Sequence, residues 1–337
     1  MLSNRLKRVL PSIISANQSA FVVGWTIVQN ILICQDLVRL YNRKQTTSSC
    51  LIKIDLKIAY DTVEWDFVEE MLYALEFPQK CIKWIMNCVT TVQYSITING
   101  GLYGSIKGKR GLRQEDLISP LLFVICMECF TRIMNVVAEQ QGFKFHTKCR
   151  SLKLNHLCFA NDVLIFSKRD FQTVLLLLRG LKTFSNATGL CTNTTKSNIF
   201  SVNMPVQSMQ DLIELTGYTK GSLPFRYLGV PMSAKRISKM DCEMLIDKIT
   251  ARIRSWGTRY FSYAGRVLLV NSVLLHIHSY WSSIFLLPKQ VLKGITALCK
   301  NFLWDGKTAI NRVTLVAWDL VCRAKREGGL GITDCFK

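Results

Sequence analysis

The spacing of hydrophobic and polar positions changes several times along the chain. From residue 27 to 41, apolar side chains recur every three to four positions, which predicts a helix that ends near residues 42–44. The run CLIKIDL at 50–56 is rich in β-branched and apolar residues, so it predicts a short strand that contains one acidic residue. A helix is expected to follow, beginning near Thr62.

Two further stretches have the pattern of paired strands. In VQYSITING at 92–100, strand-like composition ends in the turn signal Asn-Gly, and LYGSIK follows. LCFANDVLIF at 157–166 places Asn161 and Asp162 between two apolar runs, which predicts two short strands joined by a tight turn. The apolar stretch at 117–140 predicts a long buried helix after Pro120.

The last third of the chain returns to helical spacing. Residues 238–256 place apolar side chains close to one helical stripe with basic residues outside it, which predicts a core-facing surface rather than a cofactor site. The members of this stripe are Met240, Met244, Ile249, Ile253 and Trp256. No internal repeat occurs, and the C-terminal third is expected to be mostly helical.

The amino-acid composition of the chain indicates what kind of partner it binds. The chain has 337 residues, and 49% of them are hydrophobic, which is typical of a globular protein with two or three subdomains. Lys and Arg number 43 against 23 Asp and Glu, so the formal net charge is +20. Such a surplus makes nucleic acid the leading candidate partner, and a merely basic soluble protein is the alternative.

Cysteine and histidine do not indicate a metal centre. The 13 cysteines are an odd number without a regular framework, which favours a reducing compartment over a disulfide scaffold. Cys126 and Cys129 form one Cys-x-x-Cys inside an apolar run, without a second pair at zinc-ligand spacing, so they are interpreted as core thiols. His276 and His278 have no acidic or cysteine neighbour in sequence and are interpreted as structural.

Two stretches, at 11–35 and 267–288, lack charged residues for more than twenty positions. Polar side chains such as Gln18 and Asn271 interrupt each of them at a density that a bilayer core would penalise. The N-terminus has too short an apolar segment for a signal peptide. We therefore expect no membrane partner and an intracellular location, in the nucleus or the cytoplasm.

Two carboxylates stand out as candidate chemistry. Asp55 is at the end of the predicted strand LIKID, and Asp162 lies in the turn of the predicted hairpin. Two carboxylates at strand ends can meet at one sheet edge, and hard oxygen ligands suit magnesium, which supports in-line nucleotidyl transfer when two ions are held about 4 Å apart. Taken singly, each Asp is better explained as an ordinary turn or cap residue.

Ten segments resemble, in this order, the reverse transcriptase of plant LINE-type non-LTR retrotransposons. They are NQSAFVVGWTIVQNIL, IKIDLKIAYDTVEWDFV, GLRQEDLISPLLF, CFANDVLIF, GLCTNTTKSNIF, FRYLGVPM, RIRSW, FSYAGR, NFLWDG and GGLGI. The resemblance covers essentially the whole chain and implies an α+β right-hand polymerase with an antiparallel palm sheet. Partial fingers would occupy 1–50, the palm with the remaining fingers elements 51–230, and a mostly helical thumb or connection region 231–337.

The resemblance also implies site residues and ligands. Asp55 and Asp162 would bind metal, Mg²⁺ or Mn²⁺, and Tyr60 would exclude the 2′-hydroxyl of a ribonucleotide. Arg113, Gln114 and Lys196 would border the dNTP. RNA template and DNA primer are the implied partners, and no stable small-molecule cofactor is expected. Basic residues that would bind nucleic acid, or that simply form solvated faces, are Lys107, Lys109, Arg110, Arg252, Arg254, Arg259 and Arg266.

Several positions depart from the family pattern. The catalytic FADD-type motif reads FAND, so Asn161 stands where the family has its metal-binding Asp. An amide oxygen can coordinate magnesium but brings no formal charge. In GLRQEDLISP, Glu115 and Leu117 replace the usual Gly and Pro. Trp25 and Ile58 stand where Arg and Lys are usual.

Three functional classes follow from these departures. The first is an RNA-directed DNA polymerase with residual activity, impaired or inactivated by Asn161. The second is an inactive nucleic-acid-binding remnant, because phosphate contacts need no metal. The third is a non-functional translation product. The family's upstream endonuclease and a Cys/His-rich tail are not among these residues, so we expect that the chain cannot copy a complete element by itself.

Overall fold

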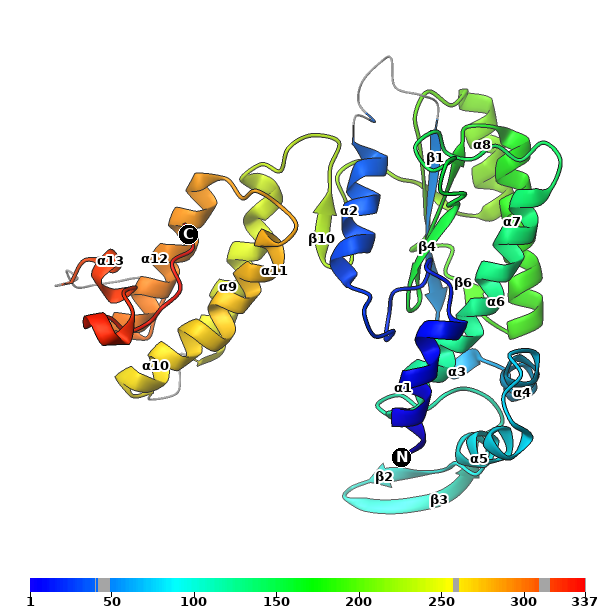
Figure 1. Ribbon diagram of the computed structural model, residues 1–337, viewed down its shortest axis with the longest axis horizontal. Helices are drawn as coiled ribbons and strands as arrows, with labels where there is room; N and C mark the ends of the chain where they lie inside the picture. Colours follow the sequence, from blue (N-terminus) through cyan, green and yellow to red (C-terminus); the bar gives the residue numbers. More distant parts are fainter. Residues whose placement is uncertain (40, 42–48, 257–260, 309–315, 337) are drawn as a thin grey trace. The chain divides into compact units, whose positions relative to one another are not determined.

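The computed structural model describes residues 1–39, 41, 49–256, 261–308 and 316–336, and these form two compact units, Met1–Leu223 and Pro224–Lys337. The first unit mixes helices with a largely antiparallel sheet, and the second is mainly helical (Figure 1). The α+β class expected from the alternating patterns is therefore confirmed.

A central sheet organises the first unit. Its strands are arranged in the order β4-β5-β1-β7-β8, and β6 pairs with the end of β1. All pairs are antiparallel except β7 with β8. The strand bounds are β1 Ser49–Lys57, β4 His156–Phe159, β5 Asp162–Lys168, β6 Cys191–Thr192, β7 Asn198–Ser201 and β8 Thr219–Lys220.

The middle strand of this sheet is β1, and its burial explains its sequence. From Ser49 to Ile52 every residue is buried, because β5 and β7 flank the strand on both edges and helices cover it. The sequence of a strand that is buried on both faces is a nearly continuous run of apolar residues. Towards its end, Lys53 and Asp55 are only half-buried, so polar side chains share one face there.

Helices cover both faces of the sheet. In Figure 1, α2 lies on one side, and α6, α7 and α8 lie on the other. Gly180 of α7 allows the close approach of α6, since a Cβ at that position would lie 2.9 Å from a Val137 methyl group. The helix bounds are α2 Ile27–Val38, α6 Ser119–Glu139, α7 Phe171–Thr188 and α8 Val206–Thr216.

The buried helix predicted after Pro120 is confirmed as α6, with Pro120 in its first turn. Cys126 is fully buried in it, and Cys129 is half-buried. Among the described residues, α6 is also the single helix long and apolar enough to cross a membrane. Thirteen of its residues are buried in the protein, which is the pattern of a core helix.

Residues 1–13 and 59–107 form the rest of the first unit. The predicted hairpin is present as β2 and β3, with Asn99 and Gly100 in the turn, and its side chains are almost all exposed. The bounds of these elements are α1 Leu2–Ile13, α3 Ala59–Thr62, α4 Trp65–Ala74, α5 Gln79–Thr90, β2 Gln93–Ile98 and β3 Gly101–Lys107.

Two predicted helix ends were wrong. The helix expected to reach 42–44 stops at Val38, where Arg39 takes an extended-type ψ of 128°, and residues 42–48 lie outside the described part of the chain. The helix expected from Thr62 is divided: α3 ends at Thr62, Val63 is extended, and α4 starts at Trp65. Val63 breaks the helix because its carbonyl accepts from Gly111 and its side chain is buried.

The second unit contains a short hairpin followed by helices, as the helical spacing predicted. Its main helix, α9, buries Leu245, Ile249 and Ile253, while Met240 is 76% exposed. The predicted stripe was therefore wrong at Met240, which precedes the helix. Element bounds are β9 Phe225–Tyr227, β10 Val230–Met232, η1 Met240–Cys242, α9 Glu243–Trp256, α10 Tyr263–Leu269, η2 Val270–Leu274, α11 Leu275–Ser282, α12 Lys289–Asp305, α13 Trp318–Val321 and η3 Lys325–Glu327.

Candidate active site

The two candidate carboxylates lie directly opposite each other. In the antiparallel pairing of β1 with β5, the register partner of Asp55 is Asp162. Side chains opposite each other in such a pair have Cβ atoms about 4.5–5.5 Å apart and lie on one face of the sheet. The two residues are 107 positions apart in sequence, and the register of β1 with β5 brings them together. The sheet brings together the two residues that the sequence analysis singled out.

The tight turn predicted between two short strands is present as a two-residue connection between β4 and β5, but the placement of Asp162 in the turn was wrong, because Asp162 is the first residue of β5. Phe159 pairs with Asp162, which leaves Ala160 and Asn161 as the loop. Ala160 has a φ of 51°, and a positive φ at the first loop residue is what the tight two-residue hairpin turns require. Asn161 is half-buried, and among the described residues its side chain has no hydrogen-bond partner. Its amide is therefore available to a ligand.

Burial and charge perturb the carboxylate on β5. Burial raises the pKa of the Asp162 carboxyl above its usual range, the Lys53 ammonium lowers it, and the negative charge of Asp55 raises it again. Lys53 lies two residues before Asp55 in β1 and so shares its face of the sheet. Two neighbouring carboxylates that repel each other form a site that a bound cation stabilises.

The donor set at this site can be tested against magnesium. Asp55 and Asp162 offer carboxylate oxygens, which are the ligands that Mg²⁺ prefers, and Asn161 offers a neutral amide oxygen beside them. Within the described ranges there is no group of three or more His, Cys, Asp or Glu side chains that could hold a metal. The residues therefore fit a hard divalent cation held by two charged donors, with one fewer negative charge than a FADD-type site.

Gln18 supports the FAND turn from the N-terminal segment. Its Oε1 accepts hydrogen bonds from the backbone N–H of Ala160 at 3.2 Å and of Ala20 at 3.1 Å. Residues 17–19 run along β4, where Cys158 donates to the Asn17 carbonyl and accepts from Ser19. Gln18 is 1% exposed. The NQSAF motif alone does not indicate this role, because the contact joins residues 142 positions apart in sequence.

Buried polar side chains form hydrogen bonds at the start of β4, the end of the strand that lies away from the FAND turn. The His156 ring contacts Thr131 Oγ1 at 3.1 Å and Asn155 Oδ1 at 2.6 Å. Asn155 donates through Nδ2 to the Met134 carbonyl of α6 at 2.8 Å. Burial lowers the pKa of His156 to about 3, so the ring is neutral at pH 7. A neutral imidazole, fully hydrogen-bonded, therefore anchors the hairpin to the core helix.

The segment 108–116 folds back onto α3. The Gly111 amide donates to the Val63 carbonyl at 2.8 Å, and the Leu112 amide donates to the Tyr60 carbonyl at 2.6 Å. Gly111 has a φ of 90°, and a Cβ there would lie 2.7 Å from the Asp61 carbonyl oxygen, so only glycine fits. These contacts bring the IAYD and GLRQ motifs side by side.

Two predicted nucleotide-site residues meet at this junction. Tyr60 is half-buried, and its ring stacks on Phe123 at a centroid distance of 4.8 Å. Gln114 donates through Nε2 to the Asp61 carboxylate at 3.3 Å. The sequence analysis missed Asp61, although its place one residue after Tyr60 on a short helix could have suggested a polar partner for the loop.

The remaining nucleotide-site candidates are less closely held. Arg113 is exposed and pairs with Asp116 at 3.2 Å. Lys196 is exposed in the turn between β6 and β7. That turn is tied to β1, because the Asn193 amide donates to the Asp55 carbonyl at 2.8 Å. The turn that carries Lys196 is therefore hydrogen-bonded to β1, the strand that carries Asp55.

The basic nucleic-acid candidates have different surroundings. Lys107, Lys109 and Arg110 are exposed around the end of β3, and Arg110 contacts Glu64 at 3.4 Å. Arg252 and Arg254 are exposed on α9. Arg259 lies outside the described residues.

Arg266 has a structural environment. Its Nη1 donates to the carbonyl oxygens of Leu303 at 3.2 Å and Trp304 at 2.8 Å, in the last turn of α12. Because a helix C-terminus leaves carbonyl groups without intrahelical partners, the guanidinium caps α12. This contact accounts for the arginine of FSYAGR without a nucleic-acid partner.

Two departures from the family pattern occupy unusual backbone positions. Glu115 has a φ of 66°, and Ile58 has a φ of 48°. The left-handed region costs an ordinary L-residue about 1–2 kcal/mol, and β-branched residues tolerate it least. Glycine at position 115 would take this conformation without strain, which gives a physical reason for the family's glycine there.

Replacing Glu115 with Gly is expected to raise the free energy of unfolding by about 1 kcal/mol, because it relieves the positive φ at an exposed site. Glu115→Ala is the matched control, since it removes the same charge but keeps the strain. Chemical denaturation of the three proteins measures the difference. Equal stabilisation by Ala and Gly would show that charge, not backbone strain, is responsible.

The fold and site together define a polymerase-type palm, with two carboxylates at paired positions of neighbouring antiparallel strands. Residues 1–232 match the family model described as reverse transcriptase (RNA-dependent DNA polymerase). The chain therefore belongs to the reverse transcriptase family, and its relatives confirm the resemblance to non-LTR retrotransposon enzymes.

Two curated relatives show the extent of this likeness. The uncharacterized 149 kDa protein of transposon TX1 from Xenopus laevis is 24% identical over 317 residues, which is 91% of this chain and 23% of that protein. The retrovirus-related Pol polyprotein from the type-1 retrotransposable element R2 of Popillia japonica is 26% identical over 219 residues, covering 62% of this chain and 35% of the polyprotein. The chain thus spans about a quarter to a third of these relatives.

A solved structure of telomerase from Candida albicans in complex with a fragment of telomeric RNA is also similar. It has a TM-score of 0.50 and 11% identity, over 89% of this chain and 45% of that one. At this identity the likeness concerns the fold alone, and it confirms the right-hand polymerase architecture that the sequence motifs implied.

Proposed function

We propose that this chain is the catalytic module of an RNA-directed DNA polymerase whose activity is reduced by Asn161. The observation that carries the proposal is the register of Asp55 with Asp162, in a chain of the reverse transcriptase family. Residues 1–50 would serve as partial fingers, 51–230 as the palm with the remaining fingers elements, and 231–337 as the thumb. The site of action would be inside the cell, in the nucleus or the cytoplasm.

Asp55 and Asp162 would hold Mg²⁺ or Mn²⁺, with the amide oxygen of Asn161 as a neutral neighbour. The bound ion would supply Lewis-acid stabilisation of the charge that develops during nucleotidyl transfer. Burial raises the pKa of Asp162, and the positive charge of the nearby Lys53 partly offsets that rise. The hairpin would be kept in position by Gln18 at its turn.

The incoming dNTP would lie beside the junction of α3 with the 108–116 segment. The Tyr60 ring, supported by Phe123, would contact the sugar and exclude a 2′-hydroxyl by its bulk. Gln114, held by Asp61, would border the base and sugar. Arg113 and Lys196 would add positive charge near the triphosphate, and Glu115 opposes that charge.

Primer extension on an RNA template tests this proposal. The chain should extend an annealed DNA primer with dNTPs in Mg²⁺ or Mn²⁺, slowly but above the level of an Asp55→Ala variant. Extension equal in the two proteins would be due to contamination, and it would overturn the proposal.

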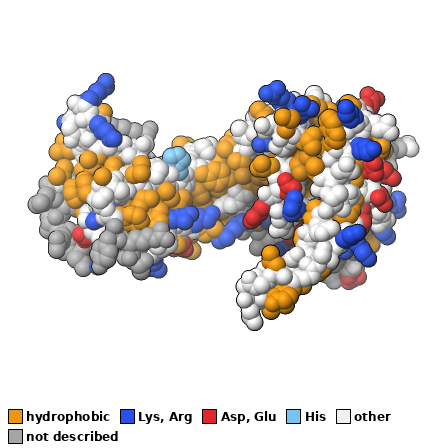
Figure 2. Space-filling view, turned by 90° about the horizontal axis from the view of Figure 1, so that it is seen from below, with side chains coloured by type: hydrophobic (Ala, Val, Ile, Leu, Met, Phe, Trp, Pro, Cys, Tyr) orange, Lys and Arg blue, Asp and Glu red, His pale blue; other side chains and the backbone are white. Residues whose placement is uncertain are grey.

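A second candidate function is RNA binding without catalysis. The net charge of +20 supports it, and Figure 2 shows Lys and Arg side chains on the surface of each unit. Arginine and lysine contacts to phosphate release counterions, so their strength depends steeply on salt. If this function has outlived catalysis, affinity for RNA should remain when the Asp55 carboxylate is removed.

For about six phosphate contacts, RNA affinity is expected to fall by roughly 10²- to 10³-fold between 50 and 200 mM salt. Replacing both Arg252 and Arg254 with Gln should reduce the slope of log affinity against log salt by about 1.4. Arg326→Gln is the matched control, because Arg326 is 86% exposed and pairs with Glu327. Affinity that does not change with salt would exclude a phosphate-based interface.

A further inference from the structure

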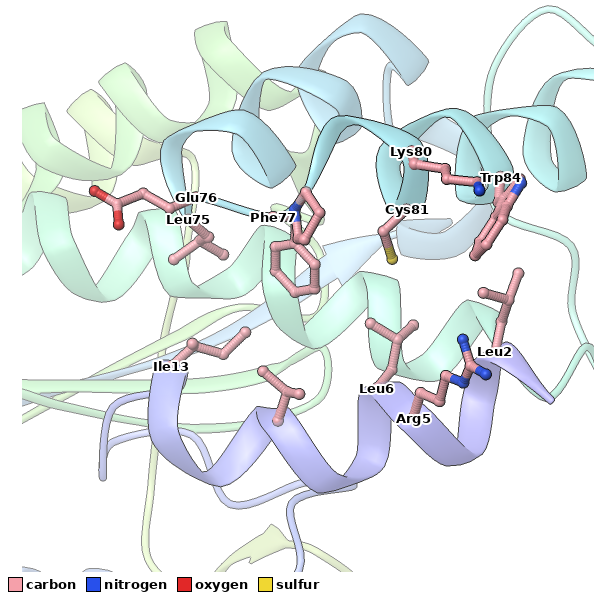
Figure 3. Close-up of a pocket in the computed structure, with 12 residues that line it drawn as sticks. Leu2, Arg5, Leu6, Ile13, Leu75, Glu76, Phe77, Lys80, Cys81 and Trp84 are labelled. Carbon is pink, nitrogen blue, oxygen red and sulfur yellow. The ribbon is translucent and has the colours of Figure 1, made fainter.

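An apolar groove lies between α1 and the α4–α5 corner, away from the paired carboxylates. Its volume is about 430 Å³, and most of the side chains that line it are apolar. Figure 3 shows α1 along one side and α5 along the other, with Phe77 and Leu6 directed into the space between them. None of the proposed catalytic or nucleotide-binding residues lines this groove.

Both helices present apolar residues to the groove at helical spacing. On α1 these are Leu2, Leu6, Val9 and Ile13, which follow one another at intervals of four, three and four. On the other side, Cys81 and Trp84 of α5 are three residues apart, and Phe77 lies in the connection just before that helix. Facing stripes with this spacing form the seam into which a further helix inserts its side chains.

Much of this apolar surface is uncovered. Val9 is 42% exposed, and Trp84 is also 42% exposed, although each lies beside buried residues of the core. Leu6, in contrast, is 3% exposed and forms the floor. A concave apolar seam with exposed walls is the geometry of helix-in-groove recognition.

The rims of the groove are basic. Helices α1 and α5 together carry five basic side chains and no acidic one. These residues are Arg5, Lys7, Arg8, Lys80 and Lys83, and all are exposed; Arg5 and Lys80 line the groove and form its basic rims, and the other three lie elsewhere on the same helices. Lys80 lies over the Trp84 ring at 5.4 Å, and among the described residues neither Arg5 nor Lys80 forms an ion pair. In Figure 3, Glu76 points away from the groove at its opposite end.

We propose that this groove binds an acidic amphipathic helix of another protein, with apolar residues at i, i+4 and i+7 and Asp or Glu beside them. The charge of the rims selects the acidic partner. A second copy of this chain would bring its own Arg5 and Lys80 against the same two residues, on helices that carry no acidic side chain, which opposes a symmetric contact. Single-stranded RNA would satisfy the rims but would leave its sugar and phosphate groups against Leu6 and Phe77.

Fluorescence anisotropy with a labelled helical peptide tests the proposal. The probe has about five helical turns, with Leu at i, i+4, i+7 and i+11 and Glu at the flanking positions. A peptide of the same composition, with its Leu residues distributed around the helix, controls for attraction to a basic protein. The amphipathic peptide should bind at physiological salt, and the scrambled peptide should bind at least about tenfold more weakly.

Variants locate the binding surface. Val9→Asp places a charge on the groove wall at a partly exposed position, and it should weaken binding by about tenfold or more. The matched control is Val206→Asp on α8, where the side chain is 86% exposed and outside the groove, and this variant should bind as the parent does. Thermal unfolding of both variants verifies that each is folded.

A charge swap tests partner selection. The double variant Arg5→Glu with Lys80→Glu should lose affinity for the acidic peptide and gain affinity for the same peptide with Lys in place of Glu. Equal binding of the amphipathic and scrambled peptides would overturn the proposal, as would unchanged binding to Val9→Asp. If Val9→Asp instead weakens binding of a single-stranded RNA oligonucleotide or dissociates a dimer, the groove serves RNA or a second copy, and the proposal is wrong.

Discussion

Replacing Asn161 with Asp is expected to raise the rate of primer extension by about two to three orders of magnitude, in Mg²⁺ and on an RNA template. A second carboxylate beside Asp162 adds one negative charge at the turn that closes β4 on β5. A gain of roughly 3–4 kcal/mol in transition-state stabilisation corresponds to this factor, because each 1.4 kcal/mol is tenfold.

The structure makes this substitution a clean test. Asp and Asn have nearly the same shape, and the Asn161 side chain has no hydrogen-bond partner among the described residues. The turn is held through the Ala160 amide and Gln18, which the substitution does not alter. The change should therefore alter charge and ligand chemistry at the site while it leaves the hairpin in position.

Two controls define the result. Asp55→Ala in the Asn161→Asp background should abolish the gain, since one carboxylate of the register pair is then missing. Asn203→Asp makes the same chemical change at an exposed residue outside the site and should have no effect on the rate. If the Asn161→Asp protein extends primers no faster than the parent, the missing carboxylate is not what limits activity. Glu115, Leu117, Trp25 or Ile58 would then be tested next.

The second large effect concerns acid stability. Burial lowers the pKa of His156 to about 3 and that of His146 to about 4, whereas the unfolded chain titrates near 6.5. Between these values the unfolded state binds more protons, so the free energy of unfolding falls as the pH falls below 6.5. From pH 7.5 to 5.0 we expect a loss of about 2 kcal/mol for each histidine, or roughly 4 kcal/mol together.

Denaturant unfolding at several pH values measures this dependence. His156→Asn should remove about half of the pH-dependent loss, even if it lowers stability at every pH. His276→Asn, which makes the same chemical change at an exposed position, is the matched control. Asp162 opposes the trend at the acid end, because burial raises its pKa and folding then favours its protonated form. A stability that is constant between pH 7.5 and 5.0 would contradict the assignment of these histidines as buried and neutral.

Much of the first unit could be predicted from local sequence. Asn99-Gly100 identified the β2–β3 hairpin, and the apolar runs around Asn161 identified β4 and β5, because turn chemistry and strand composition act over a few residues. The long helix after Pro120 was equally clear. Its end signals and apolar content are also local.

The site required long-range information. The sequence led us to expect only that Asp55 and Asp162 could meet at one sheet edge; their pairing in register was not predicted, because no local rule fixes which residues of two distant strands pair. The hydrogen bonds of Gln18 with the FAND turn and of Asp61 with Gln114 could not be predicted. Each joins two segments that are far apart in sequence, and neither segment carries a local pattern that indicates the other. The exposure of Met240 depends on the helix starting only at Glu243.

Because Gln18 supports the FAND turn, the fold of the hairpin and the chemistry of the side chain at position 161 can change independently. The hydrogen bond goes to a backbone amide, so the shape of the hairpin does not depend on the side chain at position 161. Exchange of that side chain consequently changes the charge of the site and leaves this hydrogen bond in place, and abundance and proteolytic resistance follow the free energy of unfolding rather than the rate of catalysis. Copies of such a polymerase can drift in chemistry while they continue to accumulate as folded protein, and any partner that recognises their surface still meets an intact molecule.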